Sequence, residues 1–499
     1  MTIMKNIIYL FFICYVTIHL SSCVTGSGEL TGRTTTRLMY SIEPNYGMVK
    51  LPGGSFTMGA NDQDVPYSNR NNLKTITISP FWIDQTEITN NEYRQFTYWV
   101  RDSIIRKELI ESDDPDKWGY VSDPDPNWNQ TLLDEEQQRS EDYHIDWYRP
   151  LNFQKDVVTE AMINTLILSE EDQIIMEGEN ILRPFFQTKL IDTRKLIYEY
   201  AWFNRESAAS RNNRFEYDEE VEFDRSDYRE LDGGRAEAFV IKERVPIYPD
   251  TLAWVHDFTY NFNEPMFDKY FWHPAYDKYP VVGVSWKQAK AFCHWRTAYK
   301  LYHLPEERRI FETEYRLPTE AEWEWAARGG RELAMFPWGG PYSRNYDGCF
   351  LANFKPLRGN YWADGYIYTA PSLSYEQNDY GLYNMAGNVA EWTETAFDPM
   401  SDIFASDLNP DYTYNANNGD HPHFKKKVVK GGSWKDIGAF LQIGARDYEY
   451  QDSSRCYVGF RCVKSLPFNE DSESTLEDRF EKVKKPKNKK KKKRNQINY

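Results

Sequence analysis

The stretch GLYNMAGNVAEW, from Gly381 to Trp392, carries the pattern on which the fold prediction depends. Its glycines and asparagines favour tight turns and left-handed backbone positions over an ordinary helix. Asn384, Asn388 and Glu391 also place hard oxygen donors close together, and calcium prefers ligands of this type. Taken alone, the stretch fits a glycine-rich turn with a capping glutamate at least as well as it fits an ion site.

Around this stretch, three segments begin like capped helices. In each, a Ser or Thr is followed three residues later by Glu or Gln, so that side chains satisfy the exposed backbone amides. The three pairs are Thr89–Glu92, Ser285–Gln288 and Thr319–Glu322. Met48 to Gly59 looks like a β-hairpin around Pro-Gly-Gly, and Thr75 to Ile83 looks like one strand. The pattern predicts an α+β fold with much irregular structure.

Length and composition allow more than one arrangement of domains. The 499 residues could hold about three average domains, or one large irregular domain with an insertion. We expect an acidic, aromatic-rich and partly helical insertion over residues 101–275, between parts of one domain at 46–100 and 276–466. A solvated, partly disordered excursion is nearly as good an interpretation for Glu111 to Gln138.

The N-terminus reads as an export signal. Lys5 precedes an apolar run from Ile7 to Leu20 that is short for a membrane-spanning helix. Leu20-Ser21-Ser22-Cys23 resembles a bacterial lipobox, which implies a signal peptide over residues 1–22, lipidation of Cys23 and a polar tether over 23–45. An uncleaved anchor, or a secreted protein with a chance cysteine, are the alternatives.

The C-terminal residues 467–499 are expected to form a disordered basic tail. Ten of the residues from Lys482 to Arg494 are basic, so the formal charge of −16 becomes −26 for the rest of the chain. The tail could meet anionic lipid or an acidic partner. Nucleic acid is a poor partner for an exported protein with so acidic a body.

Four of the six cysteines remain after the signal and the lipidation site are set aside. They are Cys293, Cys349, Cys456 and Cys462. Disulfides persist in exported proteins, and four cysteines allow three pairings, among which the spacing alone does not choose.

An ordered set of motifs resembles the formylglycine-generating enzyme, or sulfatase-modifying factor, family. The set runs PGGSFTMG, FWIDQTEITNNEY, YPVVGVSW, AFCHW, RLPTEAEWEWAARGG, FPWG, LANF, GLYNMAGNVAEW, VVKGGSW, GAR and GFRC. One such string would be weak evidence for the family, whereas the whole set in this order is specific for it. The resemblance implies an α+β domain with little regular secondary structure, related to C-type lectins.

The resemblance also implies two structural calcium sites. At the first, the ligands would be Asn353, Asp364 and the carbonyls of Phe354 and Tyr366. At the second, they would be the side chains of Asn384 and Glu391 and the carbonyls of Gly387 and Val389. Ala390 departs from the family, which usually has Trp there, but this removes no ligand.

The copper chemistry of the family is expected to be absent. Its oxidation of a substrate cysteine uses two cysteines between the GGS and AAR motifs, and soft thiolates are what copper(I) requires. The corresponding segment, Lys435 to Arg446, contains no cysteine. The resemblance further implies a disulfide between Cys293 and Cys462, which leaves Cys349 and Cys456 to pair or stay reduced. We therefore expect a catalytically silent domain without copper.

The lipobox, the domain, the insertion that starts within WVRDSIIRKEL and the basic tail together resemble the PorK/GldK lipoproteins. These belong to the type IX secretion system and gliding machinery of Bacteroidota. The resemblance implies a structural outer-membrane lipoprotein that faces the periplasm and forms a large ring with a PorN/GldN partner. The alternatives are a copper-dependent formylglycine-generating-type oxidase and a lectin-like protein whose Trp338, Trp362 and Trp434 stack on sugars.

Overall fold

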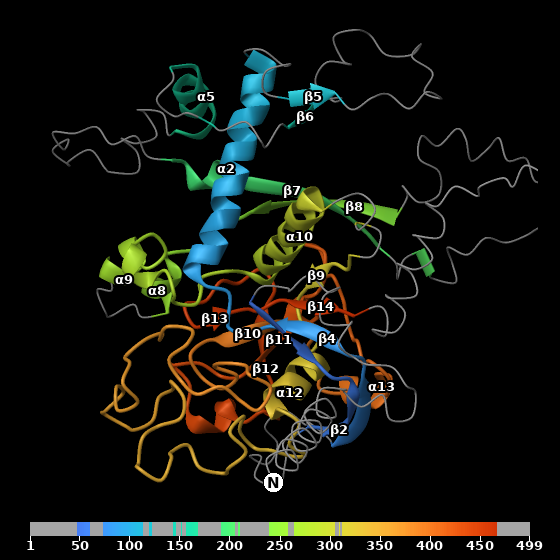
Figure 1. The fold of residues 1–499 in the computed structure, drawn as a ribbon, viewed down its shortest axis with the longest axis vertical. Helices are drawn as coiled ribbons and strands as arrows, with labels where there is room; N and C mark the ends of the chain where they lie inside the picture. The colour runs from blue at the N-terminus through green and yellow to red at the C-terminus, as the bar shows by residue number, and fades with distance from the viewer. Residues whose placement is uncertain are drawn as a thin grey trace, which may run out of the picture. The chain divides into compact units, whose positions relative to one another are not determined.

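The structure is a computed structural model (Figure 1). It describes residues 47–59, 73–112, 119–121, 143–145, 151, 156–167, 191–204, 208–209, 239–257, 264–304, 309 and 312–466. The expected signal peptide, Cys23, the tether up to residue 46 and the basic tail from residue 467 lie outside the described residues. Contacts divide the chain into Val49–Ser465 and a unit made of both ends. The elements below belong to the first unit, apart from Met48 at the start of β1.

Two four-stranded sheets form the centre of the domain. The first has the order β1-β4-β14-β9 and the second β12-β11-β10-β13. The strands of the first are β1 Met48–Leu51, β4 Phe81–Asp84, β9 Tyr315–Arg316 and β14 Val463–Ser465. Those of the second are β10 Ala390–Ala396, β11 Lys426–Lys430, β12 Asp447–Tyr450 and β13 Val458–Gly459. Both sheets therefore join residues that are distant in the sequence, and the last residues of GLYNMAGNVAEW lie in β10.

The predicted hairpin at Met48–Gly59 is wrong. The Pro-Gly-Gly turn separates β1 from β2, Gly54–Met58, but β1 pairs with β4 and β2 pairs with β3, Lys74–Ile78. A Cβ at Gly53 would lie 2.9 Å from the Ile78 carbonyl oxygen and from Pro80, so the chain crosses itself closely here. For the same reason Thr75–Ile83 is two strands, since Ser79-Pro80 carries the chain from one sheet to the other.

All three predicted capped helices are present. They are α2 Asn90–Ser112, α10 Trp286–His303 and α12 Glu320–Arg328. Ser285 and Thr319 form capping boxes, and Gly329 ends α12 in the left-handed conformation. Helix α12 packs against β10 and β2, and its Trp323 is buried in the main core.

Several short elements lie between α2 and α10. They are β5 Gly119–Val121, β6 Tyr143–Ile145, α5 Asp156–Leu166, η2 Thr193–Lys195, β7 Ile197–Phe203, β8 Val240–Pro246, α8 Ala253–His256, α9 Glu264–Lys269 and η5 Pro274–Tyr276. Strands β7 and β8 pair antiparallel, and the pair contacts α10. Helix α2 continues through residue 101, so the expected boundary falls inside a helix, and the insertion remains a prediction. Within the described residues, no helix has the length and apolar character needed to cross a bilayer.

Mixed helix and strand content with long irregular segments agrees with the predicted α+β class. The short elements after β10 are α13 Ser401–Phe404, η6 Pro422–Lys425 and η7 Gly438–Leu441. From Gly329 to Val389 no helix or strand is formed, and this stretch holds most of the predicted calcium ligands.

Candidate functional site

The stretch before β10 folds as a series of left-handed turns. Asn384, Gly387 and Asn388 all have positive φ angles, of 52°, 80° and 65°. A Cβ at Gly387 would collide with the carbonyl of Asn353, and the amide of Asn388 donates to that same carbonyl at 2.8 Å. Glycine is therefore required where the two predicted calcium sites come together.

The Glu391 carboxylate is already paired with a cation of the protein itself, the guanidinium of Arg461. Its Oε1 lies 2.6 Å from Nη2 of Arg461, and its Oε2 accepts from Nε of Arg461 and from Nε1 of Trp323, both at 2.7 Å. Glu391 and Arg461 are fully buried. Such a bidentate pair already neutralises the carboxylate. As a calcium ligand, Glu391 would have to share its oxygens with Arg461.

Glu87 is the carboxylate that the sequence interpretation missed. The side-chain amides of Asn384 and Asn388 donate to its two oxygens at 3.1 and 3.0 Å. Burial raises the pKa of Glu87 to about 7, although Arg461 opposes the shift; the charge of Glu391 adds to it. Among the described residues Glu87 forms no ion pair. The TEIT motif that contains it was visible in the sequence, but nothing there connected it to residues about 300 positions away.

Oxygen atoms without a partner lie on Asn384 and on residues that hydrogen-bond to Asn384 and Asn388. Within the described part of the chain, the buried side-chain oxygens Oδ1 of Asn384, Oδ1 of Asn353 and Oγ of Ser372 have no hydrogen-bond partner. The Ser372 carbonyl also accepts from the Asn384 amide. Buried polar atoms are normally satisfied, and a carboxylate among free oxygens is the environment a hard cation needs. The residues around Asn384 therefore fit calcium, with Glu87 as the carboxylate best placed to hold it.

The residues of the first predicted calcium site lie together. The Asp364 carboxylate accepts the amides of Phe354 and Tyr366, at 2.8 and 3.5 Å. Burial raises the pKa of Asp364, and these amides oppose the shift. At Phe354 and Tyr366 the backbone amides donate the hydrogen bonds to Asp364, whereas the prediction assigned the carbonyls of these two residues as calcium ligands. The fit here rests on the free Oδ1 of Asn353 and on the Asp364 carboxylate, and both calcium sites remain predictions.

The described ranges contain no cluster of side chains typical of other metal sites. No three His, Cys, Asp or Glu side chains gather there as a metal-binding group. This does not test the calcium sites, since amide and carbonyl oxygens supply most of their ligands.

The segment from Lys435 to Arg446 presents oxygen donors and apolar side chains and contains no cysteine. Asp436 Oδ2 accepts from the amide and the hydroxyl of Ser433, at 3.0 and 2.6 Å, and Leu441 in η7 is buried. Beside it lies a solvent-open cavity of about 430 Å³, whose lining includes Asp436, Asp447, Glu449, Phe440, Tyr448 and Tyr457. Carboxylates are hard donors, so this lining does not suit copper(I).

The structure brings one predicted cysteine pair together. The sulfurs of Cys293 and Cys462 lie 3.3 Å apart as buried thiols, and burial raises the pKa of Cys462. The disulfide between them remains a prediction. Cys349 is exposed whereas Cys456 is buried, and both are free thiols.

The three tryptophans of the lectin alternative differ in exposure. Trp434 is buried and stacks on Trp254, and Trp338 stacks on Phe336. Trp362 is exposed. The three therefore do not form one open aromatic surface.

Comparison with known families decides what the domain is. The sulfatase-modifying factor enzyme 1-like domain family, FGE-sulfatase, matches residues 37–154 and 248–466, which is more than half of the chain. This chain belongs to that family. The match leaves out residues 155–247, which lie within the predicted insertion.

Members of the FGE-sulfatase family similar to this chain include both active and inactive proteins. The formylglycine-generating enzyme of Bos taurus is 35% identical over 191 residues, which are 37% of this chain and 44% of the relative. The inactive C-alpha-formylglycine-generating enzyme 2 of the same species is 32% identical over 192 residues, 37% of this chain and 50% of the relative. The chain thus spans about half the length of these curated relatives.

Proposed function

We propose that this protein is a structural, catalytically silent member of the FGE-sulfatase family. The observation that carries the proposal is the segment Lys435–Arg446, where Asp436 is tied to Ser433 and no thiolate is present. A family that contains a protein named inactive, 32% identical to this one, supports this interpretation.

The role that we propose is that of a lipoprotein subunit of the type IX secretion and gliding machinery. It would be anchored to the outer membrane through Cys23, face the periplasm, and form a large ring with a PorN/GldN-type partner. The lipobox-like LSSC, the insertion and the basic tail support it through their resemblance to PorK/GldK lipoproteins. Calcium would keep the FGE-sulfatase domain rigid, so that it can serve as a scaffold for the ring.

Two experiments test this role. Protein extracted in detergent should co-purify with a PorN/GldN-type protein in particles much larger than a monomer; a persistent monomer without this partner contradicts the proposal. Cys23→Ala should move the protein from the membrane fraction to the soluble fraction, whereas a variant that stays in the membrane would mean that the N-terminus is an uncleaved anchor.

A copper-dependent oxidase is the second candidate, because an enzyme named formylglycine-generating is 35% identical to this chain. Incubation with copper and a cysteine-containing sulfatase peptide separates the two. We expect no formylglycine product, and any turnover that depends on added copper would overturn the proposed silence.

A further inference from the structure

An exposed turn lies in the long irregular stretch between α12 and β10, drawn in yellow to orange in Figure 1. We call the residues Lys355–Trp362, with the sequence KPLRGNYW, the 355–362 loop. Every residue from Leu357 to Trp362 is exposed. The exposed fractions of Leu357, Tyr361 and Trp362 are 45%, 48% and 66%. Single exposed apolar residues are ordinary, but three on one turn mark an interaction surface.

Backbone hydrogen bonds fold this loop into one tight turn. The Asn360 amide donates to the Leu357 carbonyl at 3.2 Å, and the two residues form an antiparallel bridge. Gly359 between them has a φ of 83°, which favours glycine. The Lys355 ammonium lies 4.7 Å from the centre of the Tyr361 ring. The basic and aromatic side chains of the loop therefore share one small region.

The base of the 355–362 loop is fixed to the domain. The Lys355 amide donates to the Asp436 carbonyl at 2.9 Å. Directly before it, the Phe354 amide donates to the Asp364 carboxylate at 2.8 Å, which joins the two ends of the loop. The exposed side chains thus project from an ordered backbone, which lowers the ordering cost of binding.

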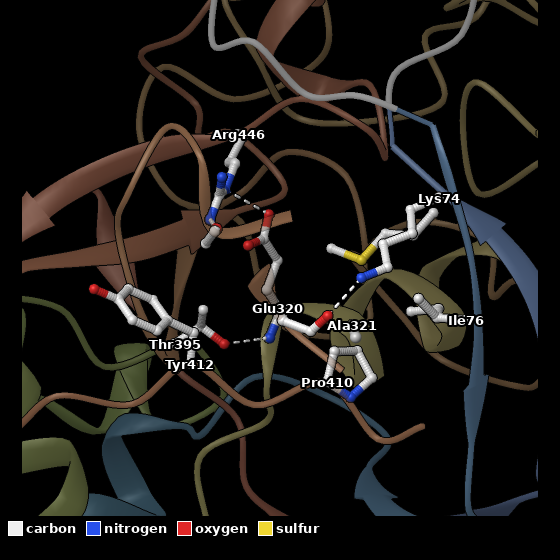
Figure 2. A pocket seen from close by; sticks show the side chains of 11 residues that line it. Lys74, Ile76, Glu320, Ala321, Thr395, Pro410, Tyr412 and Arg446 are labelled. Carbon is white, nitrogen blue, oxygen red and sulfur yellow. Dashed lines mark hydrogen bonds and ion pairs between the residues drawn. The ribbon is translucent and has the colours of Figure 1, made fainter. Parts of the chain in front are cut away.

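Basic side chains elsewhere in the domain already have carboxylate partners. Figure 2 shows a cavity whose lining includes Lys74 and Arg446. There Nε of Arg446 lies 2.9 Å from the Glu320 carboxylate, and Nζ of Lys74 lies 2.9 Å from that of Asp407. The cations of this cavity are therefore neutralised by the protein itself.

The two basic side chains of the 355–362 loop have no such partner. Within the described part of the chain, neither Lys355 nor Arg358 forms an ion pair, and the loop contains no acidic residue. The carboxylates at its base are occupied, since Asp364 accepts backbone amides and Asp436 accepts from Ser433. The loop thus carries two uncompensated positive charges on a chain with a formal charge of −16.

A lipid surface with anionic headgroups is the occupant that this composition fits. Trp and Tyr favour the boundary between headgroups and acyl chains, where an apolar ring and a polar tip are both satisfied. Lys and Arg are attracted by the negative surface potential of anionic lipids, which repels the acidic remainder of the chain. A glycan is recognised through hydrogen bonds to its hydroxyls, and the loop has no carboxylate and one amide side chain, Asn360, to make them.

We propose that the 355–362 loop docks on an anionic lipid bilayer, with its apolar and aromatic side chains at the level of the headgroups and its two basic side chains on lipid phosphates. The inference rests on the proposed function, since lipidation of Cys23 would keep the domain next to a membrane. An anchor on a tether leaves the orientation of a domain open, whereas a second contact with the same membrane sets it.

The test uses the full-length, lipidated chain in vesicles of equal parts phosphatidylglycerol and phosphatidylethanolamine. Asn360→Cys carries a polarity-sensitive fluorophore, in a Cys349→Ser background because the other described cysteines are buried. We expect its emission to shift to shorter wavelength on the vesicles and to be quenched by nitroxide-labelled lipid. A fluorophore at Asn418→Cys, which is also exposed, is the matched control and should report water.

Two double variants separate the apolar contribution from the charged one. Leu357→Asp with Trp362→Asp should lower the ratio of membrane-bound to free loop at least about tenfold, because two apolar groups are lost from the interface. Lys355→Gln with Arg358→Gln should lower this ratio about tenfold on the anionic vesicles and leave it unchanged on phosphatidylcholine vesicles.

The matched control for the apolar variant is Phe404→Asp with Leu408→Asp. It makes the same two changes of charge at side chains with exposed fractions of 56% and 61%, outside the 355–362 loop. The ratio of bound to free loop should change less than about twofold. Melting temperatures within a few degrees of wild type show which variants are folded.

The outcomes separate this inference from the proposed function. If the chain floats with the vesicles but the fluorophore at position 360 reports water, the inference is overturned while the anchor and the ring role stand. Loop variants that leave the signal unchanged overturn it as well, as does a signal that requires the PorN/GldN-type protein. A chain that does not float with the vesicles contradicts the proposed anchor, and this inference fails with it.

Discussion

The oxygen-lined centre around Glu87 and Glu391 differs from the segment Lys435–Arg446 in how its charges are held. Glu391 is held by Trp323 and Arg461, about 70 positions away, and Glu87 by asparagines about 300 positions away. Asp436 instead binds Ser433, three positions away. The oxygen-lined centre joins side chains from distant parts of the chain, whereas Lys435–Arg446 is a loop held by contacts between near neighbours. The loop can therefore change its chemistry while the fold is kept.

The largest effect should come from the ion pair in the oxygen-lined centre. Glu391→Gln leaves the buried guanidinium of Arg461 without its charge partner, and breaking a buried pair in this way costs about 3–5 kcal/mol of unfolding free energy. Denaturant unfolding measures the loss. Asp436→Asn is the control from the loop and should cost well under half as much. Equal losses for the two variants would contradict the contrast between the regions.

Removal of calcium should have the next largest effect. At a free calcium concentration of a hundred times Kd, a single site bound only by the folded state contributes about 2.7 kcal/mol, so a chelator should lower the melting temperature. Asn384→Ala and Glu87→Gln should reduce the response to the chelator to what the site at Asn353 and Asp364 contributes, because they remove the amide oxygen and the carboxylate charge of the other site. Glu391→Ala should fall below the chelated wild type, because it also breaks the pair with Arg461.

Asn345→Ala provides the control for the calcium experiment. Asn345 closes a turn through the amides of Asp347 and Cys349 and is not one of the predicted calcium ligands, so the response to the chelator should persist. A wild-type melting temperature that the chelator leaves unchanged would remove both predicted calcium sites.

A smaller effect is expected in the loop. Asp436→Ala deletes the acceptor of the Ser433 amide and hydroxyl, which should cost about 0.5–1.5 kcal/mol, the usual net value of a hydrogen bond. Thermal unfolding of the variant beside Ser433→Ala measures it. A loss as large as that of Glu391→Gln would mean that the loop supports the fold as much as the centre does.

Features that depend on neighbouring residues were predictable from the sequence. The capping boxes at Ser285 and Thr319 and the glycine end at Gly329 follow from contacts three or four residues apart. The α+β class and the family also followed from ordered motifs. The hairpin at Pro52-Gly53-Gly54 failed because strand pairing was decided elsewhere, by β3 and β4.

The candidate site shows the same limit. The family resemblance implied Asn384 and Asn353 as ligands, and the side-chain oxygen of each is buried without a hydrogen-bond partner in the described part of the chain. Their role as calcium ligands stays a prediction. The sequence could not show that Arg461 takes the Glu391 carboxylate, or that Glu87 lies under Asn384 and Asn388. These contacts exist only after the two sheets have formed, so a motif can indicate a ligand type without showing which charge is already neutralised.

The smallest effect concerns Asp447, the first residue of β12, which directly follows the loop. Burial raises the pKa of Asp447, and the charges of Asp436 and Glu449 add to the shift, while Lys435 opposes it. A raised folded-state pKa means that the folded protein binds the proton more tightly, so this group's contribution to stability decreases as pH rises from the ordinary aspartate pKa through the raised value. Asp436→Asn should lower the pKa of Asp447, as read from carboxyl carbon shifts in an NMR titration. An unchanged pKa would mean that the charge of Asp436 does not act on Asp447.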